Sequence, residues 1–169
     1  MRDAKQVNAP AATQTQTEYV YDATDRLVRR VDPRGKYDEY TYNSQGQVTR
    51  VTDRRGVVTV FRYDALGRTS LVGFGTTGPL GSEVFESFQH YVYDAQGRVH
   101  RVEDSTSGDV QFDYNDLDQV LTETTPQGTL HYTYDVHGRR DTMRLDTGSG
   151  VHYDYDTRDR LHAVTRGTQ

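Results

Sequence analysis

Histidine is the best metal ligand in this cysteine-free chain, and three of its six histidines recur at equivalent places in a repeated pattern. His90, His131 and His152 each come directly before an aromatic residue, so a row of imidazoles along a sheet could bind a metal ion. Other copies of the pattern have different residues at this place, namely Glu18, Glu39, Val60 and Gln111. We therefore interpret the three histidines, like the equivalent pair His100 and His162, as part of a solvated polar face. The sequence predicts no metal site and no cofactor.

Carboxylates could supply the acid and the base of a glycosidase. The chain contains 25 Asp and Glu residues, but five of the aspartates occupy equivalent places in the pattern: Asp22, Asp64, Asp94, Asp135 and Asp156. A catalytic pair needs unlike environments that separate two pKa values, and repetition makes environments alike. No serine lies in a nucleophile-elbow pattern, and Gly73-Phe74-Gly75 lacks the third glycine and the following helix of a phosphate-binding loop. We predict that the chain is not an enzyme.

The elements that carry these residues are copies of one unit, seen most clearly at residues 91–99, YVYDAQGRV. With the first aromatic as position zero, the unit has Tyr at position two, Asp or Asn at three, Gly or Asp at six, and Arg or Gln at seven. Its seven copies begin at Tyr19, Tyr40, Phe61, Tyr91, Phe112, Tyr132 and Tyr153. Five of the six steps are 20 or 21 residues and the third is 30. This period is typical of repeat proteins whose units pack on their neighbours.

Each unit has the turn residues of a β-hairpin. Asp or Asn at position three with Gly at position six favours a type I turn followed by a left-handed residue and a bulge. Asp25, Asp118 and Asp159 replace that glycine, and Asp tolerates the left-handed region better than most residues. A second turn ends most units, as at residues 32–35, 53–56 and 125–128. Two turns in each unit predict an all-β antiparallel meander of about fourteen short strands, which should curl.

The repeat motif supplies the candidate structural residues. They are Tyr21, Asp22, Arg26, Tyr42, Asn43, Gln47, Tyr63, Asp64, Gly67, Arg68, Tyr93, Asp94, Gly97, Arg98, Tyr114, Asn115, Gln119, Tyr134, Asp135, Gly138, Arg139, Tyr155, Asp156 and Arg160. The aromatic residues at positions zero and two share one face of the sheet, where we expect the rings to stack on one another. Five copies combine Asp at position three with Arg at seven, whereas two combine Asn with Gln. This joint exchange predicts that the two side chains touch across the turn.

Composition limits the remaining functions. Only 33% of the residues are hydrophobic, which suits a thin sheet, and the net charge of −5 has no block of one sign that would indicate a nucleic-acid partner. No apolar run is long enough for a membrane span. We expect residues 1–18 to form a leader, an arm or an edge strand, and residues 19–169 to form the repeat domain. A glycine-rich insertion at about residues 73–90 interrupts it.

The run of Tyr-x-Tyr-Asp-x-x-Gly-Arg-Val units, from Tyr19 to about Arg166, resembles the YD-repeat or Rhs (rearrangement hot spot) family. That family includes bacterial polymorphic toxins, shell subunits of insecticidal toxin complexes, and teneurins. The resemblance implies a β-strip that forms part of a hollow toxin-encapsulating shell, in a secreted or cell-surface protein. Its partners would be neighbouring repeats of a longer chain, a second copy joined through sheet edges, or an enclosed toxin domain. The alternative is an extracellular carbohydrate-binding or adhesion module that uses exposed tyrosine rows.

Overall fold

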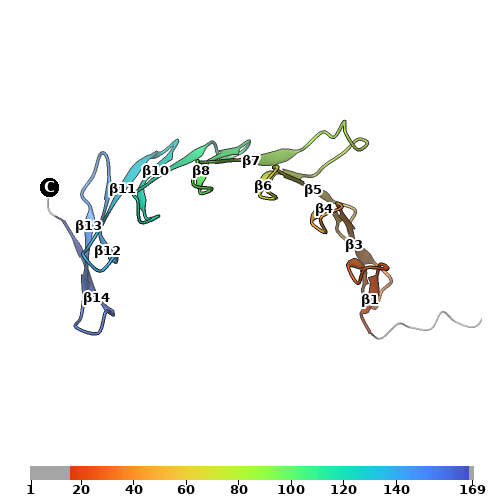
Figure 1. Ribbon diagram of the computed structural model, residues 1–169, viewed down its shortest axis with the longest axis horizontal. Helices are drawn as coiled ribbons and strands as arrows, with labels where there is room; N and C mark the ends of the chain where they lie inside the picture. Colours follow the sequence, from red (N-terminus) through yellow and green to blue (C-terminus); the bar gives the residue numbers. More distant parts are fainter. Residues whose placement is uncertain (1–15, 168–169) are drawn as a thin grey trace, which may run out of the picture. The chain divides into compact units, whose positions relative to one another are not determined.

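The computed structural model describes residues 16–167, which fold into fourteen β-strands (Figure 1). The strands are β1 (Glu18–Tyr21), β2 (Leu27–Val31), β3 (Tyr37–Tyr42), β4 (Val48–Thr52), β5 (Val58–Tyr63), β6 (Thr69–Phe74), β7 (Ser87–Tyr93), β8 (Val99–Asp104), β9 (Val110–Tyr114), β10 (Val120–Thr125), β11 (Gly128–Tyr134), β12 (Arg140–Leu145), β13 (Val151–Tyr155) and β14 (Leu161–Arg166). They follow chain order in one sheet, with β1 and β14 at its two ends. The predicted meander of seven hairpins is confirmed.

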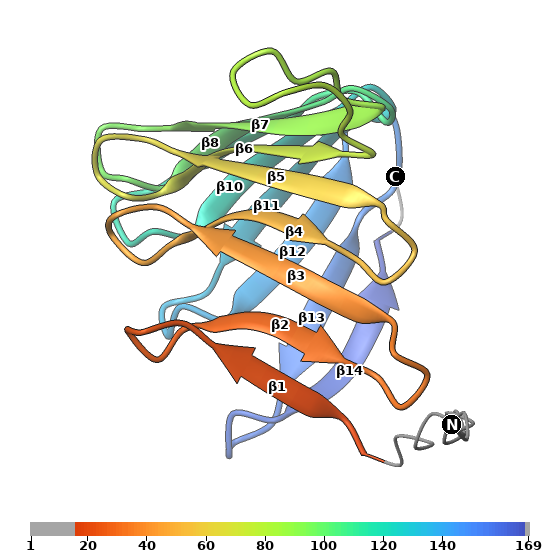
Figure 2. The same cartoon turned by 90° about the vertical axis from the view of Figure 1, so that its right-hand side faces the viewer.

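The described residues divide into two compact units. Unit 1 comprises residues 16–62 and 73–86, and unit 2 comprises residues 63–72 and 87–167. Within unit 1, β1 to β4 lie side by side in chain order (Figure 2). Of the predicted leader, residues 1–15 lie outside the described residues, and its last residue, Glu18, begins β1.

Local turn chemistry shapes each hairpin. In the fourth copy the backbone N–H of Gly97 donates to the carbonyl of Asp94 at 3.0 Å, and Gly97 has a φ of 87°. The three aspartates that replace this glycine also have positive φ, as predicted: Asp25 (60°), Asp118 (61°) and Asp159 (60°). The strand register shifts between positions one and two, for example between Val92 and Tyr93. This shift is the bulge expected beside such a turn.

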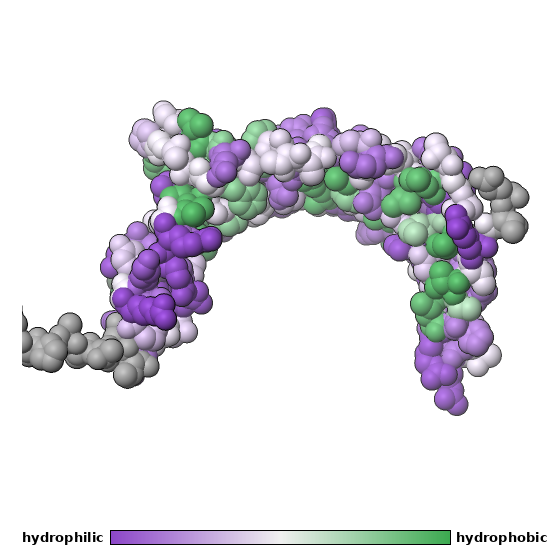
Figure 3. All heavy atoms as spheres, turned by 180° about the vertical axis from the view of Figure 1, so that it is seen from behind, coloured by the Kyte–Doolittle hydropathy of each residue, from purple (hydrophilic) through white to green (hydrophobic). Residues whose placement is uncertain are grey.

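The core is thin in both units, as the composition predicts. In unit 1 the buried hydrophobic side chains are Val58 and Val60 on β5, and in unit 2 they are Val72 and Tyr132. No side chain among residues 16–167 is completely buried. The face drawn in Figure 3 mixes hydrophilic atoms, in purple, with hydrophobic atoms, in green, and no large area of it is uniformly hydrophobic. Most of the strand residues are partly buried. None of the described residues forms a helix long and apolar enough to cross a bilayer.

Candidate functional site

The side chains at positions three and seven touch across every hairpin turn. In the fourth copy the Asp94 carboxylate accepts hydrogen bonds from the backbone N–H groups of Gln96 and Arg98, at 3.0 and 2.9 Å, and from Arg98 Nε at 2.7 Å. In the second copy the Asn43 side chain donates to Gln47 Oε1 at 2.9 Å. The predicted contact is present in all seven copies: Asp22–Arg26, Asn43–Gln47, Asp64–Arg68, Asp94–Arg98, Asn115–Gln119, Asp135–Arg139 and Asp156–Arg160.

The same arginine also reaches the next copy. The Arg98 guanidinium lies 4.5 Å from the centre of the Tyr114 ring, and Arg98 Nη1 donates to the Asn115 carbonyl at 3.0 Å. The Tyr114 hydroxyl in turn donates to the Val99 carbonyl at 2.7 Å. We call this arrangement the inter-repeat clamp. In it, the position-seven arginine of one copy lies over the position-two tyrosine of the next copy, and the hydroxyl of that tyrosine donates to the position-eight carbonyl of the first copy. It fastens one hairpin to the next with a cation–π contact and a hydrogen bond.

The clamp recurs along both units. Arginines cover tyrosines in Arg26–Tyr42 (4.8 Å), Arg68–Tyr93 (4.1 Å), Arg98–Tyr114 (4.5 Å) and Arg139–Tyr155 (4.4 Å). The hydroxyl bonds are Tyr42 to Leu27, Tyr93 to Thr69, Tyr114 to Val99, Tyr134 to Val120 and Tyr155 to Arg140, between 2.6 and 2.9 Å. After the neutral fifth copy, Gln119 Nε2 donates to the Gly138 carbonyl at 3.0 Å. The third and fourth copies begin 30 residues apart because of the insertion, yet the clamp between them, from Arg68 to Tyr93, is present.

The expected stacking of aromatic rings on one another is wrong. The structure shows a ring-to-ring contact between Phe112 and Tyr114, whose centres lie 6.5 Å apart with the rings tilted rather than stacked. Four of the seven position-two rings are instead covered by guanidinium groups, which are planar and carry the charge that a ring face attracts. The sequence holds the necessary signal, because arginine at position seven and tyrosine at position two recur with the same period. The joint exchange of positions three and seven indicates only the contact within the arginine's own turn.

Aspartate at position six adds an ion pair between copies. Asp118 and Asp159 accept bonds from the arginine of the preceding copy, Arg98 at 2.8 Å and Arg139 at 2.6 Å. Both aspartates are highly exposed, so each ion pair adds little stability. The residue that replaces glycine thus orients the clamp arginine as well as tolerating positive φ.

Hydrogen bonds from arginine hold the motif carboxylates ionised. The Arg26 side chain is the largest cause that lowers the pKa of Asp22, and the Arg160 side chain is the largest for the pKa of Asp156. For Asp94, loss of hydration raises the pKa, but the side-chain and backbone bonds from Arg98 outweigh it and the pKa is lowered. The pKa values of Asp64 and Asp135 are lowered as well.

These lowered pKa values predict that acid weakens the fold. Because the folded-state pKa lies below the unfolded value of about 4, the unfolded chain takes up protons first as the pH falls. Stability that is present above about pH 5 should therefore be lost progressively toward and below pH 3. Urea unfolding followed by circular dichroism across this range measures the loss. A variant with the neutral pairs of copies two and five, D94N/R98Q/D135N/R139Q, should show a flatter dependence on pH. If the stability of this variant depended on pH as steeply as that of the wild type, the Asp–Arg pairs would not be the cause of the acid sensitivity.

The clamp hydroxyl can be tested separately from the ring. Tyr114→Phe keeps the surface beneath Arg98 but removes the bond to the Val99 carbonyl, so it should lower the free energy of unfolding by about 0.5–1.5 kcal/mol. The matched control is Tyr21→Phe, since Tyr21 holds the same repeat position in the first copy but is 57% exposed. Chemical denaturation should show no change for the control. Equal effects at the two positions would contradict the clamp.

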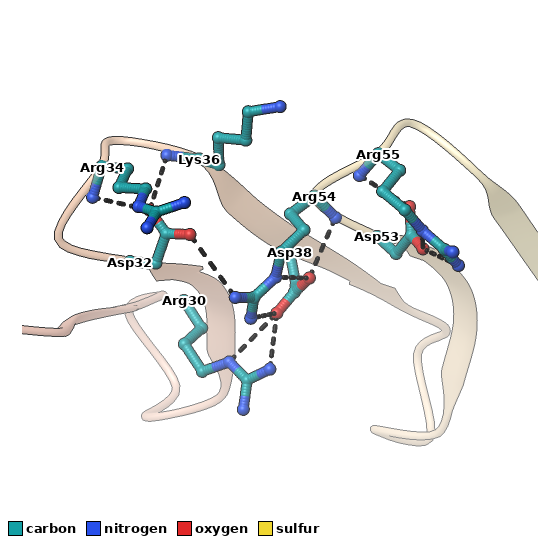
Figure 4. Close-up of polar contacts among 8 residues, drawn as sticks. All are labelled: Arg30, Asp32, Arg34, Lys36, Asp38, Asp53, Arg54 and Arg55. Carbon is teal, nitrogen blue, oxygen red and sulfur yellow. Dashed lines mark hydrogen bonds and ion pairs between the residues drawn. The ribbon is translucent and has the colours of Figure 1, made fainter.

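A second polar cluster lies in unit 1, at the ends of the strands opposite the turns of the repeat motif (Figure 4). Asp38 on β3 is 6% exposed and accepts bonds from Arg30 Nη2 at 2.7 Å and from Arg54 Nη2 at 2.9 Å. The backbone N–H of Arg54 donates to it at 3.0 Å, and Arg54 also reaches Asp32 at 3.4 Å. Hydrogen bonds from Arg54, opposed by the loss of hydration and supported by Arg30, lower the pKa of Asp38. Sequence reasoning missed this cluster, which joins the turn between β2 and β3 to the turn between β4 and β5.

Three of the histidines lie beside carboxylates. His90 pairs with Glu103 at 3.0 Å, and His131 pairs with Asp146. His152 lies 3.2 Å from both Asp141 and Asp154. His100, which the sequence assigns to the same polar face, contacts the Phe112 carbonyl at 3.0 Å. Within the part of the chain that the structure describes, no three potential ligands converge on a metal position.

The part of the insertion at residues 73–86 is an ordered turn within unit 1. After β6, the backbone N–H of Thr76 donates to the Val58 carbonyl at 2.9 Å, and Thr77 and Val84 form an isolated β-bridge. Arg62 contacts Glu83 at 3.0 Å, and the Glu83 side chain is 2% exposed. The sequence indicated a glycine-rich loop here but not these contacts.

The relation to known proteins agrees with this repeat geometry. Residues 4–167 match the family model described as the teneurin YD-shell. The chain belongs to the teneurin YD-shell family. Two solved structures with a similar fold are the Tc holotoxin pore of Photorhabdus luminescens (TM-score 0.61) and TcdB2–TccC3 without its hypervariable C-terminal region (TM-score 0.60). Each is 16% identical to this YD-shell chain, and each match covers 86% of it but 10% of the other chain. No curated protein matches it.

Proposed function

We propose that this YD-shell chain is a structural section of the β-wall that encapsulates the toxin domain of an Rhs-type bacterial toxin. The observation that carries this proposal is the inter-repeat clamp. In the clamp, arginine and tyrosine residues of the motif hold one hairpin to the next. Membership of the family supports the proposal, as does the fold shared with TcdB2–TccC3, whose chains this one matches over a tenth of their length. The wall belongs to a secreted or cell-surface protein.

The motif residues are structural rather than catalytic in this proposal. Asp94 and its equivalents are ionised and bonded to arginine, so none is a proton donor at neutral pH. Their environments are alike, whereas acid–base chemistry needs two carboxyl groups with separated pKa values. The repeated chemistry therefore supports a scaffold.

The clamp also weighs against the carbohydrate-binding alternative. A tyrosine row that binds sugars must offer ring faces to the ligand. Here guanidinium groups cover rings such as Tyr93 and Tyr155, at 4.1 and 4.4 Å, and the hydroxyls of both bond to backbone carbonyls. The most exposed position-two ring is Tyr21, at the end of the sheet.

The proposal can be tested on the full-length product of the gene that encodes this segment. Limited proteolysis followed by mass spectrometry should show a toxin domain that is protected while the wall is intact. The variant R98A/Y114A removes one clamp and should increase cleavage of that domain. Lys36→Ala is the control, because the Lys36 side chain is exposed and has no ion-pair partner among residues 16–167. Equal cleavage of the domain in the intact and clamp-deficient proteins would rule out encapsulation.

A further inference from the structure

The ion pair between Arg30 and Asp38 departs from the pattern of the repeat. It joins the first copy to the second, with Arg30 on β2 opposite Asp38 on β3. The equivalent pairs at four other junctions never combine two charged residues: Val51–Thr59, Val102–Val110, Glu123–Leu130 and Met143–Val151. An ion pair taken out of water often stabilises a fold no more than an apolar pair of similar size. Such a local departure therefore indicates a place where function sets the residues.

Asp38 holds two guanidinium groups in place. Its buried carboxylate accepts bonds from Arg30 Nε and Nη2 at 3.0 and 2.7 Å, and from Arg54 Nε and Nη2 at 3.3 and 2.9 Å (Figure 4). The backbone N–H of Arg54 donates to the same carboxylate at 3.0 Å. Because Arg30 uses Nε and Nη2 for these bonds, its Nη1 group is left to donate to another acceptor.

A small cavity lies beside the two arginines. It has a volume of about 160 Å³ and is lined by Thr17, Tyr19, Arg30, Asp32 and Arg54. Sites for drug-sized ligands usually have about 300–1,000 Å³, so this cavity suits a single small group. Its arginines belong to β2 and to the turn between β4 and β5, within the first two copies. A further strand beside β1 would extend the sheet in its own plane and would not cross this face.

The carboxylates beside the cavity are already bonded. Asp32 accepts bonds from the backbone N–H groups of Arg34 and Lys36 at 2.8 and 3.0 Å. The side chains of Asp32 and Asp38 are 18% and 9% exposed, whereas those of Arg30 and Arg54 are 42% and 39% exposed. A ligand at the cavity therefore meets positive charge first. The planar guanidinium group matches the oxygens of a carboxylate or a phosphate.

We propose that this site binds one oxyanion group, a carboxylate or a phosphate. Arg30 and Arg54 donate hydrogen bonds to the anion, and Asp38 holds both side chains in position before the anion arrives. This positioning lowers the entropic cost of binding, because neither side chain has to be ordered by the ligand. The site needs only the first two copies, so it does not rest on the enclosure of a toxin domain.

Nuclear magnetic resonance titration of the chain tests the site. Sodium phosphate or sodium acetate replaces sodium chloride at constant pH and ionic strength. Binding should shift the signals of the Arg54 backbone N–H and the Arg30 Nε–H along a saturating curve. Saturation with phosphate alone assigns the site to phosphate groups, saturation with acetate alone assigns it to carboxylates, and saturation with both assigns it to either group. Shifts that grow without saturation, or no shifts with either anion, would overturn the proposal.

Two variants separate this site from a general attraction of anions. Arg30→Gln removes one guanidinium group, while Arg54 still bonds to the Asp38 carboxylate and keeps it paired. Half-saturation should then need at least about tenfold more anion, the usual effect of losing a hydrogen bond to a charged group. Lys36→Ala is the control, because its side chain points away from Arg30 and Arg54 in Figure 4, so half-saturation should change less than about twofold. Equal weakening by the two substitutions would also overturn the proposal.

Discussion

Replacing Tyr132 with alanine should lower the free energy of unfolding by about 3–5 kcal/mol, the usual cost of deleting a buried aromatic side chain. Tyr132 is 7% exposed and is the most buried aromatic residue of the described chain. Its hydroxyl donates to Glu123 at 2.9 Å, and the Arg140 guanidinium lies 4.5 Å from the ring centre. Burial, with that bond to Glu123, raises the pKa of Tyr132 to about 12, so the phenol stays a donor at neutral pH.

The control for this prediction is built into the repeat. Tyr19 has the same position in the first copy but is 53% exposed, so Tyr19→Ala should cost much less. Urea unfolding measures the free energy of unfolding of both variants. If the two substitutions destabilise equally, burial at position zero does not determine the stability of the sheet.

Gly73→Ala should destabilise the chain by about 1–3 kcal/mol through overpacking. A Cβ atom on Gly73 would lie 2.2 Å from Cδ1 of Phe85, which is far too close. Phe85 comes from the insertion, so a methyl group at Gly73 would push the insertion off β6. The loss should appear in thermal unfolding and as faster proteolysis between residues 75 and 86.

Two further variants separate this contact from a general effect of glycine replacement. Gly148→Ala is the control, because a Cβ atom there meets nothing within 4 Å. Phe85→Ala in the Gly73→Ala background removes the clash, so the double variant should lose less stability than the sum of the single losses. Additive losses would mean that Gly73 and Phe85 do not touch.

Local chemistry made the hairpins predictable from sequence. Asp94 and Gly97 define a turn within four residues, and the joint exchange to Asn43 and Gln47 revealed a contact four residues apart. Contacts between copies were harder to predict, because they need the strand register. Arg54 reaches Asp38 from sixteen residues away, and nothing near either residue indicates that contact. The contact between Phe85 and Gly73 in the insertion was equally hard to predict, because it depends on the path of the loop between them.

The position-eight carbonyl that receives the tyrosine hydroxyl is a backbone atom, so every copy offers it whatever its side chain. It belongs to Leu27, Thr69, Val99, Val120 and Arg140 in different copies, and the hydroxyl bond forms in each case. Duplication or deletion of one whole unit in the gene therefore brings a tyrosine back to an equivalent acceptor. The length of such an array can change by recombination without redesign of any junction.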